Sequence, residues 1–578
     1  MSARLPRRVS LACTVALALA CRSPEEPPAP PRFRDVGAPG STAPEVARPC
    51  AACHRAQYDA WRRSQHAAAQ RPFDASRDGA PAGVAARGVI GVAPLRQLLV
   101  ARGGGRVQAF DPALEVATGR WFSVFDDARP PGSWGHWTGR GMSWNAQCAA
   151  CHTTGFEKGY DARADAYRSA WDAAGVACAQ CHGAMQSHPA RPVDGRTRDR
   201  AADVCASCHA RREELTGSFR AGERFDDHFR LTFADAPGAY HPDGQAADED
   251  FEAGSLALSP MGHRGVACLD CHEPHGAGLR APVDRDQLCL TCHAAGARGA
   301  PVVAAAHSHH DPTGAGARCV ACHMPEATFM QRDHRRDHGF TVPDPALAGE
   351  LGLPDACGRC HADLSPAARA GHVARWFGEG ERSRRRRARL VARAQRGDAT
   401  VARPLAEALL TERNDAWRAS MAGLLAAWTD DAAVRAALVR ALGDRSAWVR
   451  AAAARSLDGA APEAVAALTG DGVRLVRVDA AWSVRGVAPW GNAVRGEVLR
   501  WLGATCDQPA GALRRAELSW REGRSAEARE WAARAVAWDP SAPTFTAQGR
   551  LLEALGDGVG AARAYENAAL SGGSGAAR

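Results

Sequence analysis

The sequence is almost without lysine and poor in aromatic residues. The chain of 578 residues has 72 basic residues, but Lys158 is its only lysine, and aromatic residues make up 6% of it. No segment after the first 20 residues is apolar enough to span a membrane, which excludes a protein with several membrane-spanning helices. Hydrophobic residues at 46% and charged residues at 24% still allow globular domains, and the length predicts three or more of them.

The N-terminus has the pattern of an export signal. Three arginines within the first eight residues precede the short apolar run LACTVALALA, and ALA (18–20) precedes Cys21. We therefore predict a signal peptide over 1–20 and, from its many prolines, a tether over 21–44. The sequence ALAC fits either an ordinary cleavage site or an imperfect lipoprotein box, in which Cys21 would be lipidated. The protein is expected to be exported to the periplasm, the outer membrane or the cell surface, as a soluble or a lipid-anchored protein.

Cysteine is abundant and regularly spaced. Sixteen of the 19 cysteines lie in eight copies of the pattern C-x-x-C-H, here called frames 1 to 8 in chain order. A disulfide framework explains neither the odd count nor the spacing, and a zinc site does not require histidine after every second cysteine. The pattern is typical of haem c, in which two thiols bind the haem vinyl groups and the adjacent histidine binds the iron. We predict eight covalently bound haem c groups as cofactors.

The frames define two sets of predicted site residues. The haem-attaching cysteines are Cys50 and Cys53, Cys148 and Cys151, Cys178 and Cys181, Cys205 and Cys208, Cys268 and Cys271, Cys289 and Cys292, Cys319 and Cys322, and Cys357 and Cys360. The proximal iron ligands are His54, His152, His182, His209, His272, His293, His323 and His361. Haem propionates would offset the formal chain charge of +8, so the basic composition does not indicate a nucleic-acid partner. The arginines are expected to pair with propionates instead.

Histidines outside the frames are candidates for the second axial ligand of each iron. Thirteen remain, and they follow the frames along the chain. A helix is expected over 55–70, with His66 on it binding either another frame's iron or the far face of the first. His275 follows His272 too closely to share its haem and should serve a neighbour. The segment HSHHDP offers His307, His309 and His310, of which we favour His309 or His310.

Composition changes near residue 380. We predict a mostly α protein, with an octahaem cytochrome domain over 45–378 that has little regular secondary structure and a few strands within 85–125. Residues 379–503 follow a helical period and resemble HEAT repeats, with a plain helical bundle as the alternative, and 504–578 resemble tetratricopeptide repeats. Stacked helical repeats present a concave surface, so this α-solenoid is expected to dock a partner or to cap the haem core.

Several segments together resemble a known family. The sequences CAACHRAQYDAWRRSQH, HWTGRGMSWNAQCAACH, GVACAQCHG, GVACLDCHEPHGAGLR and CVACHMPEATFM are similar to multihaem cytochromes of the c-552/c-554-like family, and most closely to eight-haem members with C-terminal tetratricopeptide repeats. The resemblance implies distal iron ligands at His66, His136, His188, His228, His241, His275, either His309 or His310, and His338. The histidines His263, His307, His334 and His372 fall outside the family pattern.

Three functions fit these features. The first is an electron conduit between redox protein partners, which requires no open iron and no catalytic acid or base. The second is a multihaem oxidoreductase for a small nitrogen or sulfur compound, with one haem open to substrate. Related enzymes use a lysine ligand or an attached tyrosine at such a haem, and all eight frames here end in histidine instead, which disfavours this function. The third is an adaptor in which the haems only hold the fold together. The sequence identifies no catalytic residue.

Overall fold

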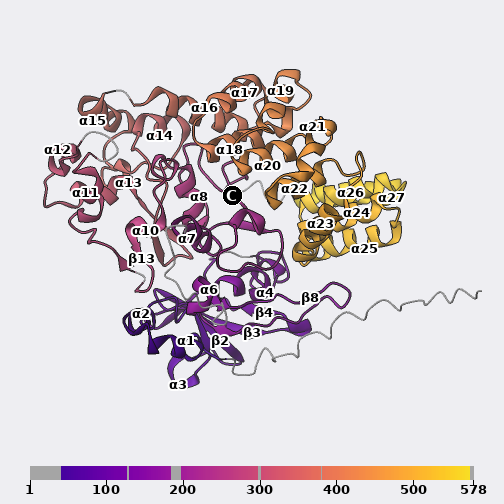
Figure 1. Ribbon diagram of the computed structural model, residues 1–578, viewed down its shortest axis with the longest axis horizontal. Helices are drawn as coiled ribbons and strands as arrows, with labels where there is room; N and C mark the ends of the chain where they lie inside the picture. The colour runs from indigo at the N-terminus through magenta and orange to yellow at the C-terminus, as the bar shows by residue number, and fades with distance from the viewer. Residues whose placement is uncertain are drawn as a thin grey trace, which may run out of the picture.

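A computed structural model of the whole chain is shown in Figure 1. It describes residues 41–125, 129–183, 197–276, 278–296, 301–378 and 380–572. The predicted signal peptide, most of the predicted tether, Cys21 and His188 lie outside these residues. Among the helices in these ranges, none is long and apolar enough to cross a membrane. We call the described residues up to 378 the frame region and those from 380 onward the helical region.

The largest sheet lies early in the frame region and is antiparallel. Its strands follow the order β1-β2-β3-β5-β6, with β4 paired to β3. The bounds are β1 (Gln70–Pro72), β2 (Ala86–Ile90), β3 (Leu95–Ala101), β4 (Val107–Ala109), β5 (Ala113–Glu115) and β6 (Arg120–Phe122). The predicted strands within 85–125 are thus confirmed. Apolar residues of the sheet, such as Ile90 and Leu99, pack with buried Trp144 and Ala149, so the sheet supports the start of frame 2.

The frame region otherwise consists of short helices and hairpins. Its helices are α1 (Ala43–Ala47), α2 (Arg55–Trp61), α3 (Ala75–Asp78), α4 (Trp144–Gln147), α5 (Ala149–His152), α6 (Cys178–His182), α7 (Thr197–Ala206), α8 (Phe251–Leu258), α9 (Pro260–His263), α10 (Cys268–Cys271), α11 (Gln287–His293), α12 (Ala304–Ser308), α13 (Cys319–His323), α14 (Pro345–Leu351) and α15 (Pro366–Phe377). Its hairpins pair β7 (Thr153–Thr154) with β10 (Ala173–Ala174), β8 (Tyr160–Asp161) with β9 (Ala166–Tyr167), β11 (Arg212–Glu214) with β12 (Phe229–Leu231), β13 (His272–Glu273) with β14 (Gly278–Leu279), and β15 (Glu326–Phe329) with β16 (Asp333–Arg336).

The helix expected over 55–70 is shorter than predicted. Helix α2 ends at Trp61, and His66 lies in the turns that follow. The indole Nε1 of Trp61 donates to the carbonyl of Val176 at 2.9 Å, and the amide of Val176 donates to the carbonyl of His66 at 2.9 Å. These bonds to the segment before frame 3 replace the helical hydrogen bonds and fix the backbone at His66.

The helical region contains longer helices stacked in pairs. They are α16 (Arg382–Gln395), α17 (Ala402–Thr411), α18 (Asp415–Leu424), α19 (Ala432–Ala441), α20 (Ala447–Ser456), α21 (Pro462–Ala466), α22 (Arg474–Ser483), α23 (Asn492–Thr505), α24 (Pro509–Arg521), α25 (Ser525–Trp538), α26 (Ala542–Ala554) and α27 (Gly558–Gly572). Gly523 has a φ of +76° in the turn that reverses the chain between α24 and α25. The boundary predicted at 503/504 falls inside α23, so the structural break follows that helix.

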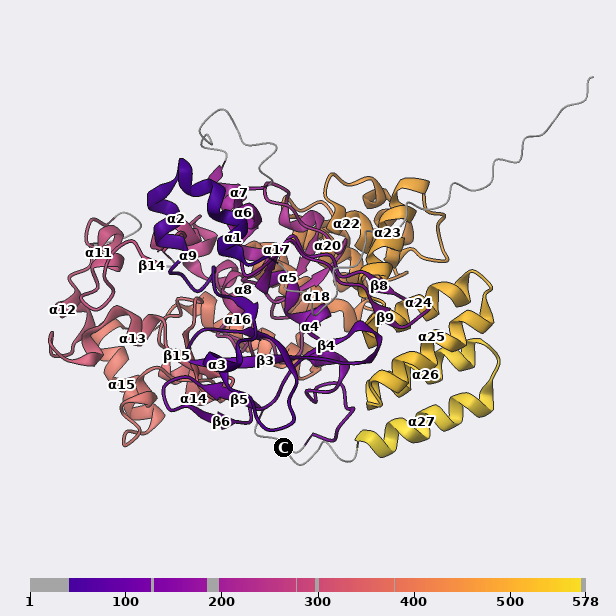
Figure 2. The same ribbon diagram turned by 90° about the horizontal axis from the view of Figure 1, so that it is seen from below.

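The two regions share one hydrophobic core. Phe229, Tyr240 and Leu258 of the frame region are buried in the same cluster as Trp417 and Leu438 of the helical region. The indole of Trp417, 1% exposed, donates to the carbonyl of Leu258 at 2.9 Å. Figures 1 and 2 show the orange and yellow helices running beside the frame region rather than apart from it. The helical region is therefore built into the fold.

The single lysine lies at this junction. The Nζ atom of Lys158 donates to the carbonyl of Ala504 at 2.5 Å and pairs with Glu214 at 3.2 Å and Asp507 at 3.3 Å. Both carboxylates raise the pKa of Lys158 against the opposing effect of burial. Tyr167 also donates to Asp507, at 2.9 Å. Since its ammonium group is enclosed by these partners, Lys158 joins the two regions and is not available to an iron.

Candidate haem centres

Each frame forms about one helical turn. The amide of the frame histidine donates to the carbonyl of the first frame cysteine, for example His54 to Cys50 at 2.8 Å and His361 to Cys357 at 2.9 Å. Residues three and four apart in such a turn lie on one side. The turn therefore presents both thiols and the imidazole together, which is the arrangement that haem attachment requires.

The frame cysteines form no disulfides and no metal clusters among the described residues. None of the 17 cysteines in these residues is bonded to another cysteine. In the same residues, no group of three or more histidine, cysteine, aspartate or glutamate side chains converges on one point. Five frame histidines instead each face one other histidine.

Five frame histidines face a second imidazole. The ring centroids are separated by 6.2 Å for His209 and His66, 6.2 Å for His182 and His275, 6.3 Å for His272 and His338, 6.2 Å for His323 and His307, and 6.0 Å for His361 and His310. Two imidazoles bound to one metal from opposite sides, at about 2 Å each, have centroids about 6 Å apart. These pairs therefore fit an iron held between two histidines.

Hydrogen bonds at Nδ1 orient several of these rings. His323 donates to the carbonyl of Thr341 at 2.9 Å and His338 to that of Arg336 at 2.9 Å. His152 donates to the carbonyl of Ala69 at 3.0 Å. A donor at Nδ1 leaves the Nε2 lone pair for a metal. Burial also lowers the pKa of His323, which favours its neutral, metal-binding form.

Two of these rings bond to carboxylates instead. His209 lies 3.2 Å from Glu252, and His275 lies 2.9 Å from Glu273. The hydrogen bond to Glu252 raises the pKa of His209. A carboxylate partner increases the basicity of a metal-binding imidazole, so these two rings should donate more strongly to an iron.

The structure brings together only some of the predicted distal ligands. His66, His275, His310 and His338 each face a frame histidine, and the one that His66 faces belongs to frame 4 rather than to frame 1. In contrast, no frame histidine faces His136, His228, His241 or His309 within the same distance, and His188 lies outside the described residues.

His307 faces frame 7 although the family resemblance did not include it. It lies in the last turn of helix α12, which ends at Ser308, and His309 follows with a φ of +54°, which turns the chain. His309 then stacks on Trp376 at 4.7 Å, while His310 turns toward His361. The spacing of the three histidines gave no signal for this choice, because the left-handed turn at His309 separates His307 from His310.

The frames contact one another in a definite order. The thiols of frames 1 and 3, 2 and 4, 4 and 5, and 6 and 7 lie close enough to shift each other's pKa. Frames 3 and 4, 5 and 6, and 7 and 8 lie close enough for their thiols to interact electrostatically. The resulting series is 1-3-4-5-6-7-8, with frame 2 attached at frame 4.

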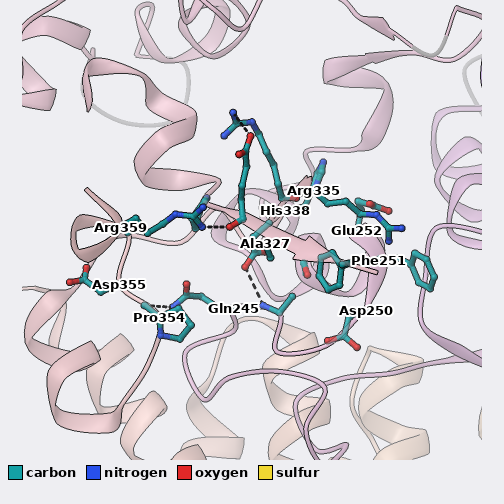
Figure 3. A pocket seen from close by; sticks show the side chains of 18 of the residues that line it. Gln245, Asp250, Phe251, Glu252, Ala327, Arg335, His338, Pro354, Asp355 and Arg359 are labelled. Carbon is teal, nitrogen blue, oxygen red and sulfur yellow. Dashed lines mark hydrogen bonds and ion pairs between the residues drawn. The ribbon is translucent and has the colours of Figure 1, made fainter. Parts of the chain in front are cut away.

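A cavity of about 380 Å³ lies beside His338 and the start of frame 8. Figure 3 shows its lining, which includes Phe251 and Glu252 from helix α8 and Arg359 from frame 8. Arg359 also donates to the carbonyl of Glu326. The lining mixes apolar side chains such as Phe251 and Phe329 with carboxylates and with the guanidinium groups of Arg335, Arg336 and Arg359. The apolar side chains suit a porphyrin ring and the guanidinium groups suit its propionates.

Comparisons with known proteins agree with this chemistry. Residues 49–82 and 137–183 match the family described as cytochrome c554 and c-prime, and residues 260–298 match the doubled CXXCH motif. No curated protein matches the chain. The crystal structure of the outer cell wall cytochrome OcwA is similar with a TM-score of 0.42 and 17% identity, over 72% of this chain and 99% of that chain, which does not establish a common fold.

The family matches identify multihaem c-type cytochrome sequence in the frame region. Haem c is therefore a cofactor of this protein, and electron transfer is its general activity.

Proposed function

We propose that the protein is an octahaem c-type cytochrome that carries electrons between redox proteins outside the cytoplasm. When bound, a haem iron alternates between its ferric and ferrous states and so accepts and releases one electron. The facing histidine pairs carry the proposal. Two imidazoles on one iron leave no position for substrate, and such an iron serves electron transfer rather than catalysis.

The order of frame contacts supports a route along the chain. Because the cysteines of successive frames lie close together, the groups that they hold are neighbours. We infer a main path through frames 1-3-4-5-6-7-8 and a branch to frame 2. Some distal ligands would come from a segment distant in sequence, as His66 does for frame 4. Such a ligand holds neighbouring centres in fixed positions.

Export follows from the N-terminal sequence. The signal-like segment before Cys21 supports transfer out of the cytoplasm, where haem is attached to such frames. A lipid on Cys21, followed by the proline-rich tether, would hold the cytochrome at a membrane surface.

The mass of the exported protein tests both points. We expect a mature chain that begins at Cys21 and carries the mass of eight haems, with a lipid mass if the anchored form is correct. Fewer than eight added haems would contradict the octahaem proposal, and no added haem would contradict the electron-transfer proposal as a whole.

Frames 2 and 6 favour a second candidate function, the reduction or oxidation of a small nitrogen or sulfur compound. Among the described residues, no imidazole faces His152 or His293 at the distance found in the five pairs. An iron with one free position binds carbon monoxide when ferrous, so a spectral shift under carbon monoxide would support an enzyme. An unchanged spectrum would contradict the enzyme and leave the electron conduit as the remaining function.

A further inference from the structure

A groove of about 500 Å³ lies at the junction of the two regions, away from the facing histidine pairs. It is formed between His263 on helix α9, the loop between α17 and α18, and the loop between α19 and α20. Its charged lining residues are Arg413, Arg418, Arg440, Arg445, Glu412 and Asp444, and its apolar ones are Leu409, Leu410 and Ala441. We call it the arginine groove.

The acidic residues of the arginine groove are already neutralised. Asp444 binds Arg418 at 2.8 Å, and Glu412 binds Arg387 at 3.0 Å. Arg413, Arg440 and Arg445 are exposed, and their guanidinium groups have no ion pair or hydrogen bond with any described residue. The groove thus keeps three uncompensated positive charges, and His263 adds an exposed imidazole at its edge.

The repeat geometry places two of these arginines side by side. Arg418 binds Asp444 before helix α20, and Arg450 binds Asp471 before helix α22. Each arginine also donates to the loop carbonyls ahead of its own helix. Arg413 and Arg445 occupy the same position in these two loops, directly before the N-cap residues Asn414 and Ser446. Since the inner arginines are satisfied, the outer pair can only reach solvent or a partner.

We propose that the arginine groove docks a carboxylate-rich segment of a redox partner protein. Arginine binds carboxylate through two parallel hydrogen bonds, and three arginines around one groove favour a cluster of acidic side chains. The exposed side chain of Leu410 in the lining suits a peptide segment better than a free inorganic anion, which gains nothing from apolar contact.

The position of the arginine groove suits electron exchange. His263 is five residues before Cys268 of frame 5, so their Cα atoms are at most about 18 Å apart. A partner seated in the groove would lie next to a middle frame of the proposed path. This inference rests on the proposed function for its purpose, but the binding itself can be tested separately.

The test measures binding of a probe peptide to the full-length holoprotein. A fluorescein-labelled peptide of alternating Leu and Glu-Glu should bind the wild type. The variant R413E/R440E/R445E should bind the peptide at least about tenfold more weakly, because three charges are reversed. Binding should weaken with salt as screening increases. The milder R413Q/R440Q/R445Q variant should lie between the two.

The matched control is R500E/R550E/R563E, which changes the same net charge at exposed positions on α23, α26 and α27. Its peptide affinity should stay within about twofold of the wild type, because none of those residues lines the groove and 0.15 M salt screens exposed charges that do not contact the peptide. Equal loss in the control would contradict a specific groove and indicate a general charge effect. Displacement of the peptide by phosphate at equal ionic strength would contradict a peptide site in favour of a small-anion site.

Reduction by dithionite separates this proposal from the proposed function. Dithionite needs no docking surface, so all variants should be reduced fully and equally. A wild type whose haems dithionite cannot reduce would contradict the electron conduit, whereas unchanged peptide binding in the R413E/R440E/R445E variant would contradict only the arginine groove.

Discussion

The frame region and the helical region are stabilised in different ways. Between Leu258 and Ala317, which includes frames 5 and 6, no described apolar residue is buried. Over a similar length between Ala388 and Leu442, the helices bury a dense set of alanine, leucine and valine side chains, with Trp417 at the centre. A segment without buried apolar side chains cannot offset its loss of conformational entropy. Frames 5 and 6 must therefore gain stability from the groups they bind, and the helices from one another.

The strongest test of this difference removes one haem. In the variant C289S/C292S we expect the loss of one haem mass and at least about tenfold faster proteolysis within 259–316, because the segment loses the contacts that order it. Residues 380–572 should resist as in the wild type. Limited proteolysis with mass spectrometry locates the cuts, and cuts spread evenly over both regions would contradict the difference.

The shared core can be weakened from the helical side. Trp417→Ala should reduce the free energy of unfolding by about 3–5 kcal/mol, because it leaves a cavity and removes the hydrogen bond to Leu258. Denaturant titration followed by helical circular dichroism measures this change. Trp520→Ala, at a half-exposed position on α24, is the control and should cost much less. An equal loss in both variants would show that Trp417 does not join the two regions.

Replacing one proposed iron ligand tests the arrangement of the frame region. His66→Ala should convert one of the eight proposed haems from low spin to high spin, because His66 lies opposite His209. Electron paramagnetic resonance of the oxidised protein measures the fraction. His263→Ala removes an exposed histidine that faces no frame histidine among the described residues, and it should leave the spectrum unchanged. If the spectrum of His66→Ala is also unchanged, His66 is not a ligand.

These two regions also differ in how far their structure followed from sequence. The frames are local patterns, so Cys50, Cys53 and His54 identify their own chemistry. The helical repeats are local too, and the helices around Gly523 lie where the periodicity predicted them. The alternating strands within 85–125 were predicted for the same reason.

Features that join distant parts of the chain could not be predicted in this way. The pairing of His66 with His209 depends on the path of the chain after Trp61, where a long-range hydrogen bond ends the expected helix. The choice among the HSHHDP histidines depends on one left-handed residue, His309. The role of Lys158 depends on Asp507, 349 residues later. No local pattern carries such information.

The smallest expected effect concerns a buried carboxyl group between the regions. Asp235 lies 3.5 Å from Arg455, and burial raises its pKa above the ordinary value although Arg455 opposes the shift. The folded protein therefore holds this proton at pH values where the unfolded chain has released it, so stability falls as the pH rises from about 4 toward neutrality. Asp235→Asn should flatten this slope and raise stability at pH 7 by on the order of 1 kcal/mol.

Thermal melts of the wild type and Asp235→Asn at pH 4.5, 5.5 and 7 measure the difference. Other groups titrate equally in both proteins. The difference in stability between the wild type and the variant at each pH therefore reports on Asp235. A constant difference across the three pH values would mean that Asp235 keeps its ordinary pKa in the fold. Asp235 would then add no pH dependence to the junction, and the contrast between its apolar core and the segment around frames 5 and 6 would be greater.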